Sequence, residues 1–147
     1  MSERRYPDRP VVGVGAVVLT ADGCVVLVRR AQPPREGEWS LPGGVVELGE
    51  TLVNGVAREV REETGLDVDV GPLVDTFEHV SRDEDGRIQY HYVVIDYLCR
   101  ARGGVARAST DASEIALADR RDLSSYDLKP ETMAVVRKAC RLAGLAD

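Results

Sequence analysis

Residues 43–66 read GGVVELGETLVNGVAREVREETGL, the most strongly patterned stretch of the chain. Three of its acids, Glu59, Glu62 and Glu63, stand at positions i, i+3 and i+4. At about 100° per residue these positions share one face of a helix, where like charges repel by a few tenths of a kcal/mol per pair. A bound cation would remove that repulsion, and carboxylate oxygens favour Mg²⁺ or Mn²⁺ over zinc. The spacing therefore predicts a helix that holds a divalent metal ion.

An apolar face adjoins the acids on the same helix. Its residues have the spacing of a helix face that packs against a sheet. They are Leu52, Val53, Val56, Ala57 and Val60. Gly55 falls on the acidic side, where a larger side chain would crowd a ligand, whereas Asn54 and Arg61 fall on the solvent side. Thr51 is suited to cap the start of the helix, and Gly65 to end it in the left-handed conformation.

This segment resembles the Nudix box, whose pattern is G-x5-E-x7-R-E-(apolar)-x-E-E-x-G-(apolar). The matching residues are Gly44, Glu50, Arg58, Glu59, Val60, Glu62, Glu63, Gly65 and Leu66. Agreement at every fixed position is much more specific than a short glycine motif. The alternative is a solvent-facing acidic helix with ion pairs such as Arg58 to Glu62. Such a helix needs neither the two glycines nor the fixed gap between Glu50 and Arg58.

Length and composition fit this interpretation. The chain has 147 residues and 44% apolar content, which suits one domain over residues 1–147 with residues 1–10 as a flexible tail. The net charge of −6 argues against a nucleic-acid or anionic-membrane surface, since both need clustered Lys and Arg. A bridging metal would still let an acidic protein bind a phosphate.

Neither cysteine usage nor the N-terminus indicates an exported or membrane protein. The cysteines at 24, 99 and 140 lack a CxxC pair, so we expect reduced thiols and neither a disulfide framework nor a zinc site. The apolar run over 11–19 is too short to cross a membrane and is unlike a signal peptide. A cytoplasmic location is therefore expected.

Hydrophobic periodicity predicts strands around the box helix. The expected elements are strands over 11–20, 24–30 and 39–41, the box helix, strands over 66–80 and 88–99, a short strand around 115–117 and a helix over 130–143. The strands over 11–20 and 24–30 should form one antiparallel hairpin, and those over 66–80 and 88–99 a second. This order matches what the resemblance implies, an α/β/α sandwich with a mixed β-sheet between helices.

The resemblance also implies a reaction and a set of ligands. The family cleaves a nucleoside diphosphate linked to another group X, releasing a nucleoside monophosphate and phosphorylated X. Carried over position by position, Glu59 and Glu63 are the principal metal ligands, Glu62 serves the same or a second metal, and the Gly43 carbonyl is an additional ligand. The positions of Glu50 and Arg58 correspond to a structural ion pair that steadies the loop against the helix.

The base that activates water is often a carboxylate on a late loop in this family. Glu114, in the segment TDASEIALAD, is the candidate here. Its alternative interpretation is an exposed loop acid, and Asp111, Asp119 or Glu59 would then take the role.

Four further residues are candidates for substrate contact. They are Arg29, Arg30, Arg35 and Trp39. One of the arginines that end the second strand could reach a phosphate, although surface solvation is the commoner fate of an arginine. Trp39 suits stacking on a base, or equally packing as an anchor beneath the loop.

The sequence indicates the substrate less clearly than it indicates the reaction. ADP-ribose hydrolases of the family commonly carry a proline where this chain has Ser81, and the tyrosine typical of diadenosine polyphosphate hydrolases is also absent. Domains with WSLPGG are often assigned to ADP-ribose or to nucleoside triphosphates. We favour ADP-ribose or a nucleotide sugar, with a triphosphate pyrophosphohydrolase as the runner-up and a non-catalytic nucleotide sensor as the third possibility. Relatives are often homodimers, so a homodimer is a further expectation.

Overall fold

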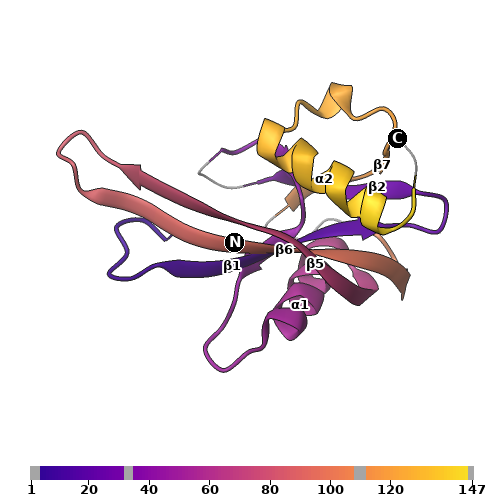
Figure 1. Ribbon diagram of the computed structural model, residues 1–147, viewed down its shortest axis with the longest axis horizontal. Helices are drawn as coiled ribbons and strands as arrows, with labels where there is room; N and C mark the ends of the chain where they lie inside the picture. The colour runs from indigo at the N-terminus through magenta and orange to yellow at the C-terminus, as the bar shows by residue number, and fades with distance from the viewer. Residues whose placement is uncertain (1–3, 32–34, 108–111, 146–147) are drawn as a thin grey trace.

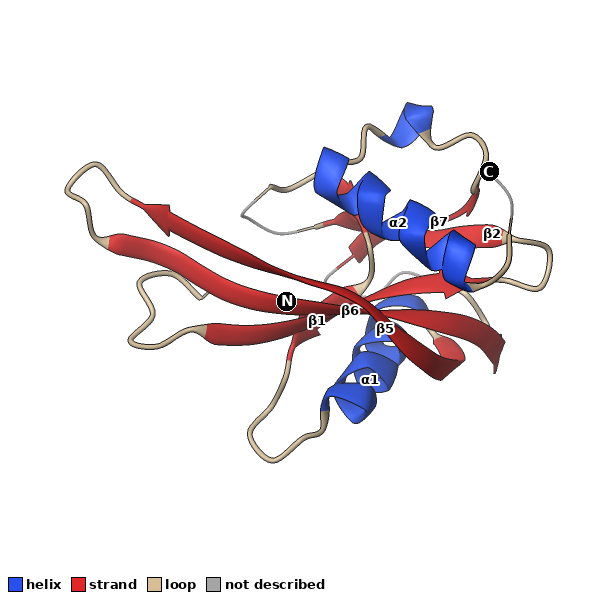
Figure 2. Cartoon of the chain, viewed as in Figure 1, coloured by secondary structure: helices blue, strands red, loops and turns tan. Residues whose placement is uncertain are grey.

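Alternating apolar residues place most of the chain in one mixed β-sheet with a helix on either face (Figure 1). The computed structural model describes residues 4–31, 35–107 and 112–145. Its elements are β1 (Val11–Leu19), β2 (Cys24–Arg30), β3 (Trp39–Ser40), β4 (Gly43–Val45), α1 (Leu52–Thr64), β5 (Leu66–Arg82), β6 (Ile88–Gly104), β7 (Ala112–Asp119), the 3-10 turn η1 (Ser124–Tyr126) and α2 (Pro130–Leu142). Helices α1 and α2 lie on opposite sides of the sheet (Figure 2), which confirms the predicted α/β/α sandwich.

The strand order is β3-β2-β1-β6-β5, with β4 also paired to β1 and β7 to β2. Strands β1 and β6 run parallel, whereas the other pairs are antiparallel. Both predicted hairpins are present. The second one is longer than expected, because β5 and β6 stay paired from Leu66 and Gly104 to Arg82 and Ile88. Its distal half extends beyond both helices (Figure 1).

Each face of the sheet has its own hydrophobic core, because alternate residues of β1 point to opposite sides. Val14, Ala16 and Val18 pack with Val56 and Val60 of α1. On the other face the core lies under α2, and its buried members are Val17, Leu19, Val25, Leu27, Val74, Leu98, Ala118, Leu123, Val135, Val136, Ala139 and Cys140. The two cores fix α1 and the loop before it at the edge formed by β4.

Two details of the helices differ from the sequence expectation. Val53, predicted in the packing face of α1, is 47% exposed, because α1 contacts β1, β4 and β5 along a narrower stripe centred on Val56 and Val60. In α2 the apolar spacing of Met133, Val136, Ala139, Cys140 and Ala143 predicts a buried stripe, but Val135 is also buried, while Met133 is only partly buried.

Part of the N-terminal segment lies along the turn of the β5–β6 hairpin. The Tyr6 amide donates to the Gln89 carbonyl at 2.8 Å, and its hydroxyl donates to Asp83 at 2.8 Å. The Arg87 guanidinium lies 4.4 Å from the centre of the Tyr6 ring. These contacts tie the first described residues to the part of the hairpin that no helix covers.

Candidate functional site

Strand β4 passes over the acids of α1 at its first two residues, which are both glycines. Strand β4 pairs with β1 so that Gly43 lies opposite Gly15 and Gly44 opposite Val14. A side chain at Gly43 would collide with the Val14 carbonyl, and one at Gly44 would collide with the Glu59 carboxylate. Glycine at position 43 therefore lets β4 lie close against β1, and glycine at position 44 lets β4 lie directly against the Glu59 carboxylate.

Helix α1 begins and ends where the sequence predicts. The Thr51 hydroxyl accepts a hydrogen bond from the Asn54 amide at 3.2 Å. At the other end Gly65 has φ of 76° and its amide donates to the Arg61 carbonyl at 2.9 Å. Gly55 has a different role from the predicted one: a Cβ there would lie 3.2 Å from Glu50 Oε1, so its small size accommodates the Glu50 carboxylate rather than a ligand.

Two of the three predicted ligand acids on α1 are buried. Glu59 is 8% exposed and Glu63 7%, whereas the Glu62 side chain is 59% exposed. This burial contradicts the alternative of a solvated acidic face, because acids on such a face would be exposed to water. Burial raises the pKa of Glu59, with the Arg58 guanidinium acting in the opposite direction.

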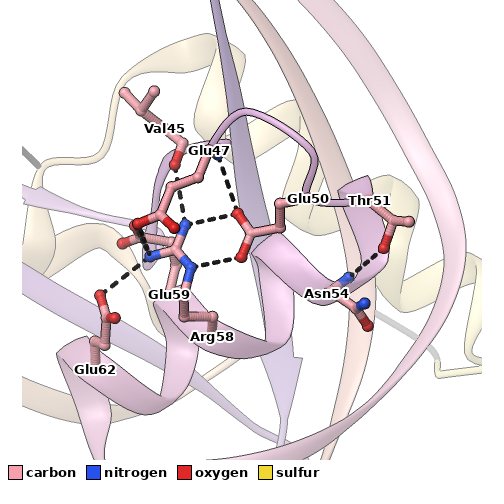
Figure 3. A network of polar contacts seen from close by, with 8 residues as sticks. All are labelled: Val45, Glu47, Glu50, Thr51, Asn54, Arg58, Glu59 and Glu62. Atoms are coloured by element: carbon pink, nitrogen blue, oxygen red, sulfur yellow. Dashed lines mark hydrogen bonds and ion pairs between the residues drawn. The ribbon is translucent and has the colours of Figure 1, made fainter.

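Arg58 connects the acids of the box (Figure 3). Its Nε and Nη2 atoms donate to the two Glu50 oxygens at 2.6 and 2.9 Å, and Nη2 also donates to the Val45 carbonyl at 3.1 Å. The Nη1 atom donates to Glu59 at 2.8 Å and to Glu62 at 3.2 Å. This bidentate contact holds the pKa of Glu50 down at about 2. The predicted structural ion pair of Glu50 and Arg58 is therefore present, and it joins the loop to the helix.

Glu63 contacts strand β4, whereas Glu59 and Glu62 contact Arg58. Its Oε1 atom accepts a hydrogen bond from the Gly43 amide at 2.6 Å. Two of the predicted ligands, Gly43 and Glu63, are thus in direct contact although they lie 20 positions apart in the sequence.

The predicted metal ligands converge on one region but are engaged by different partners. Over residues 4–31, 35–107 and 112–145, no group of three His, Cys, Asp or Glu residues is arranged to hold a metal ion. The donor set nevertheless fits a hard divalent cation, since it offers carboxylate oxygens beside a glycine loop with no side chain in the way. Arg58 supplies the positive charge that Glu59 and Glu62 share here.

Glu114 lies in a strand, and the expectation of a late loop at this point is wrong. The segment ASEIALAD forms the whole of β7, which pairs with β2 so that Glu114 lies opposite Arg29. Arg29 donates to Glu114 at 2.9 Å and to the Gly37 carbonyl at 3.0 Å. Asp119 lies at the far end of β7 and accepts from the Arg121 amide. Asp111 falls outside the described residues.

The other candidates for substrate contact lie around β2 and β3. Trp39 packs edge-to-face on Tyr126 with ring centres 5.2 Å apart, and the Arg29 guanidinium lies 6.0 Å from its centre. Its indole is therefore already packed, as expected for an anchor beneath the loop. Arg30 ends β2 half-buried, and Arg35 pairs with Glu38 at 3.4 Å.

One buried acid escaped the sequence analysis. Asp96 in β6 is 3% exposed, and burial raises its pKa to about 6, with Asp75 on the next strand adding to the effect. The signal was available, because Asp96 is a lone charge within the apolar run VVIDYLC.

Comparison with known proteins gives consistent matches. The family model described as NUDIX domain matches residues 9–138. A MutT-like protein of Streptomyces ambofaciens is 38% identical over 114 residues, which cover 78% of this chain and 67% of that protein. An ADP-ribose pyrophosphatase of Methanocaldococcus jannaschii is 35% identical over 114 residues, which cover 78% of this chain and 64% of that protein. The chain thus spans about two thirds of the length of these relatives.

A solved structure agrees in fold. The crystal structure of a MutT Nudix hydrolase from Burkholderia pseudomallei has a TM-score of 0.75 and 28% identity, covering 89% of this chain and 98% of that one. Neither described helix has the length and apolar character needed to span a bilayer.

Proposed function

Because the chain belongs to the Nudix family of hydrolases, we propose that it hydrolyses the diphosphate linkage of a nucleoside diphosphate joined to another group, with ADP-ribose or a nucleotide sugar as substrate. The observation that carries the proposal is the burial of Glu59 and Glu63 directly beneath Gly43 and Gly44 of β4. The similarity to an ADP-ribose pyrophosphatase supports the substrate class.

Gly43, Glu59, Glu62 and Glu63 would hold Mg²⁺ or Mn²⁺. Such an ion neutralises phosphate oxygens and lowers the pKa of a bound water. The chain's own contribution is to hold the acids in place. Arg58 opposes the protonation of Glu59 that burial favours, and Glu50 fixes the orientation of Arg58 through two hydrogen bonds. Glu50 and Arg58 are therefore positioning residues.

Glu114 is the proposed general base, with Asp111, Asp119 and Glu59 as the alternatives. Glu114 lies opposite Arg29 of β2, and on the other side of β2 Arg29 lies opposite Trp39 of β3, the strand that leads toward the two glycines of β4.

A nucleoside triphosphate is the second candidate substrate, because the segment WSLPGG before the box is shared by Nudix domains of both types. A cytoplasmic location and a homodimer remain predictions. The test is a panel of ADP-ribose, nucleotide sugars and nucleoside triphosphates incubated with Mg²⁺ or Mn²⁺, with the products separated by chromatography. A nucleoside monophosphate from ADP-ribose supports the first candidate, and pyrophosphate from a triphosphate supports the second. The absence of any product would leave only nucleotide sensing.

Substitution of the buried acids tests the site. Glu59→Gln and Glu63→Gln should each lower kcat by orders of magnitude, since each removes a charged oxygen donor while keeping the side-chain shape. Glu84→Gln, in the exposed turn of the β5–β6 hairpin, is the matched control and should keep the wild-type rate. Wild-type turnover in either buried-site variant would remove that residue from the mechanism.

A further inference from the structure

Asp96 is a buried acid that the proposed reaction does not use. It is the first fully buried residue along β6, whose earlier residues are only half-buried. Among the hydrogen bonds and ion pairs of the described residues, none reaches its carboxylate. Buried carboxylates normally have a partner, so an acid in this state is suited to a donor that arrives with a ligand.

The position of Asp96 relates it to the candidate site through strand register. Asp96 lies opposite Gly15 of β1, and Gly15 lies opposite Gly43 of β4. Neighbouring strands are about 4.8 Å apart, so the backbone of Asp96 is about 10 Å from that of Gly43 along one line across the sheet. A side chain at Gly15 would collide with the Asp96 carboxylate. The Asp96 carboxylate thus lies over Gly15, on the side of β6 that faces β4.

The sheet beyond Asp96 offers a flat surface on the same face. Phe77 and Val94 lie opposite each other on β5 and β6, and Phe77 is 38% exposed. Further along β6, the rings of Tyr90 and Tyr92 stack with centres 6.3 Å apart. Helix α2 packs on the inner part of this face, where it contacts β5, β1 and β6 and where its Lys138 pairs with Asp75. The distal half of the β5–β6 hairpin extends beyond the helix and stays uncovered by it (Figure 2). An aromatic ring system can lie on such a surface with one edge toward Asp96.

We propose that Asp96 accepts a hydrogen bond from the exocyclic amino group of the substrate's nucleobase and so selects amino-bearing bases over their oxo counterparts. The proposal rests on the proposed function, because phosphates near Gly43 would place a nucleoside across Gly15 toward Asp96. An amino group supplies the missing donor to a buried acceptor. An oxo group would instead set a lone pair against the carboxylate, and sites built around such a hydrogen bond reject the mismatched analogue strongly.

Binding of AMP, GMP and IMP, measured by calorimetry in EDTA, tests this contact without turnover. IMP lacks the 6-amino group of AMP and the 2-amino group of GMP and is otherwise closely matched. The wild type should bind AMP or GMP at least about tenfold more tightly than IMP. Asp96→Leu should bring these affinities together. Asp96→Asn, whose amide can donate to the oxo group of IMP, should bring them within about threefold.

Asp75→Asn is the control, since Asp75 lies opposite Asp96 on β5 but is exposed and pairs with Lys138 at 3.6 Å. It should keep the wild-type preference. Equal affinity of the wild type for all three nucleotides, no binding of any of them, or an undiminished preference in both Asp96 variants overturns the proposal. Selective binding without hydrolysis of any substrate would contradict the proposed function alone, whereas hydrolysis without selective binding would contradict only the role of Asp96.

Discussion

Two carboxylates are buried in different halves of this sandwich, and the protein treats them differently. Glu59 on α1 is 8% exposed and Asp96 on the opposite face of the sheet is 3% exposed. Burial raises the pKa of both. Glu59 accepts a hydrogen bond from Arg58 at 2.8 Å, whereas in the described part of the chain Asp96 has no such donor. The fold thus gives one buried carboxylate a cationic partner and leaves the other without one. Removing the partner of Glu59 should therefore lower the stability, whereas removing the charge of Asp96 should raise it.

Removal of Arg58 should have the largest effect. Arg58→Ala takes donors away from Glu50, Glu59 and the Val45 carbonyl at once and leaves Glu59 buried without its cation. Breaking a buried ion pair from one side typically costs about 3–5 kcal/mol. We expect a loss of this size in the free energy of unfolding, measured by urea denaturation.

Two variants sharpen that result. Arg58→Lys keeps the charge but lacks the two-pronged contact with Glu50, so it should recover only part of the loss. Arg102→Ala breaks the pair with Asp69, whose side chains are 60% and 68% exposed, and should cost less than about 1 kcal/mol. An equal loss in Arg58→Ala and Arg102→Ala would show that the box network is merely a surface feature.

Removal of the charge at position 96 should have the opposite sign. Asp96→Leu replaces a buried acid without a partner by an apolar side chain, and we expect a gain of about 1–3 kcal/mol at neutral pH. Reduced stability of this variant would indicate that Asp96 supports the fold. Circular dichroism before each denaturation series would confirm that the variant keeps the native secondary structure.

The same acid should give a characteristic dependence on pH. Its pKa is about 6 in the folded protein, above the ordinary value of 3.8, so the folded state binds its proton more tightly than the unfolded state. Stability should therefore fall by about 3 kcal/mol as pH rises from about 4 through 6. Asp96→Asn should lack this fall. Glu50 acts in the reverse direction: its pKa is about 2, so its contribution is complete above its ordinary value of 4.5 and is lost as pH decreases through 2.

The smallest effect on stability is expected at Glu114. Its pair with Arg29 is exposed, with side chains 55% and 42% accessible, so Glu114→Gln should change the unfolding free energy by less than about 1 kcal/mol. A large fall in kcat alongside this small change would support its role as the base. An unchanged rate would move that role to Asp111, Asp119 or Glu59.

The local structure of the box could be predicted because its determinants are local. Thr51 and Gly65 cap α1 through contacts within a few residues, and the spacing of the acids is fixed by helix geometry. The long β5–β6 hairpin was also predictable, since alternation and turn residues lie within the segment itself. The predicted hairpin of β1 and β2 is shorter, with the pair Leu19 and Val25 next to the turn, because β1 pairs mainly with β6 and β4.

The remaining features depend on contacts between distant segments. Glu114 is in a strand because β7 pairs with β2, and nothing within TDASEIALAD fixes that pairing. Gly55 accommodates Glu50 because of how the loop folds back on α1. Asp96 could be seen as an unusual residue in an apolar strand, but that its carboxylate has no partner follows only from the arrangement of β1, β5 and β6.

Trp39 offers a spectroscopic view of the site, because it is the only tryptophan in the chain and precedes Gly43 by four positions. Its indole lies between the Arg29 guanidinium and the Tyr126 ring. Any movement of β3 that accompanies ligand arrival would change the environment of this one emitter. Intrinsic fluorescence could therefore follow occupancy of the site in real time without a label.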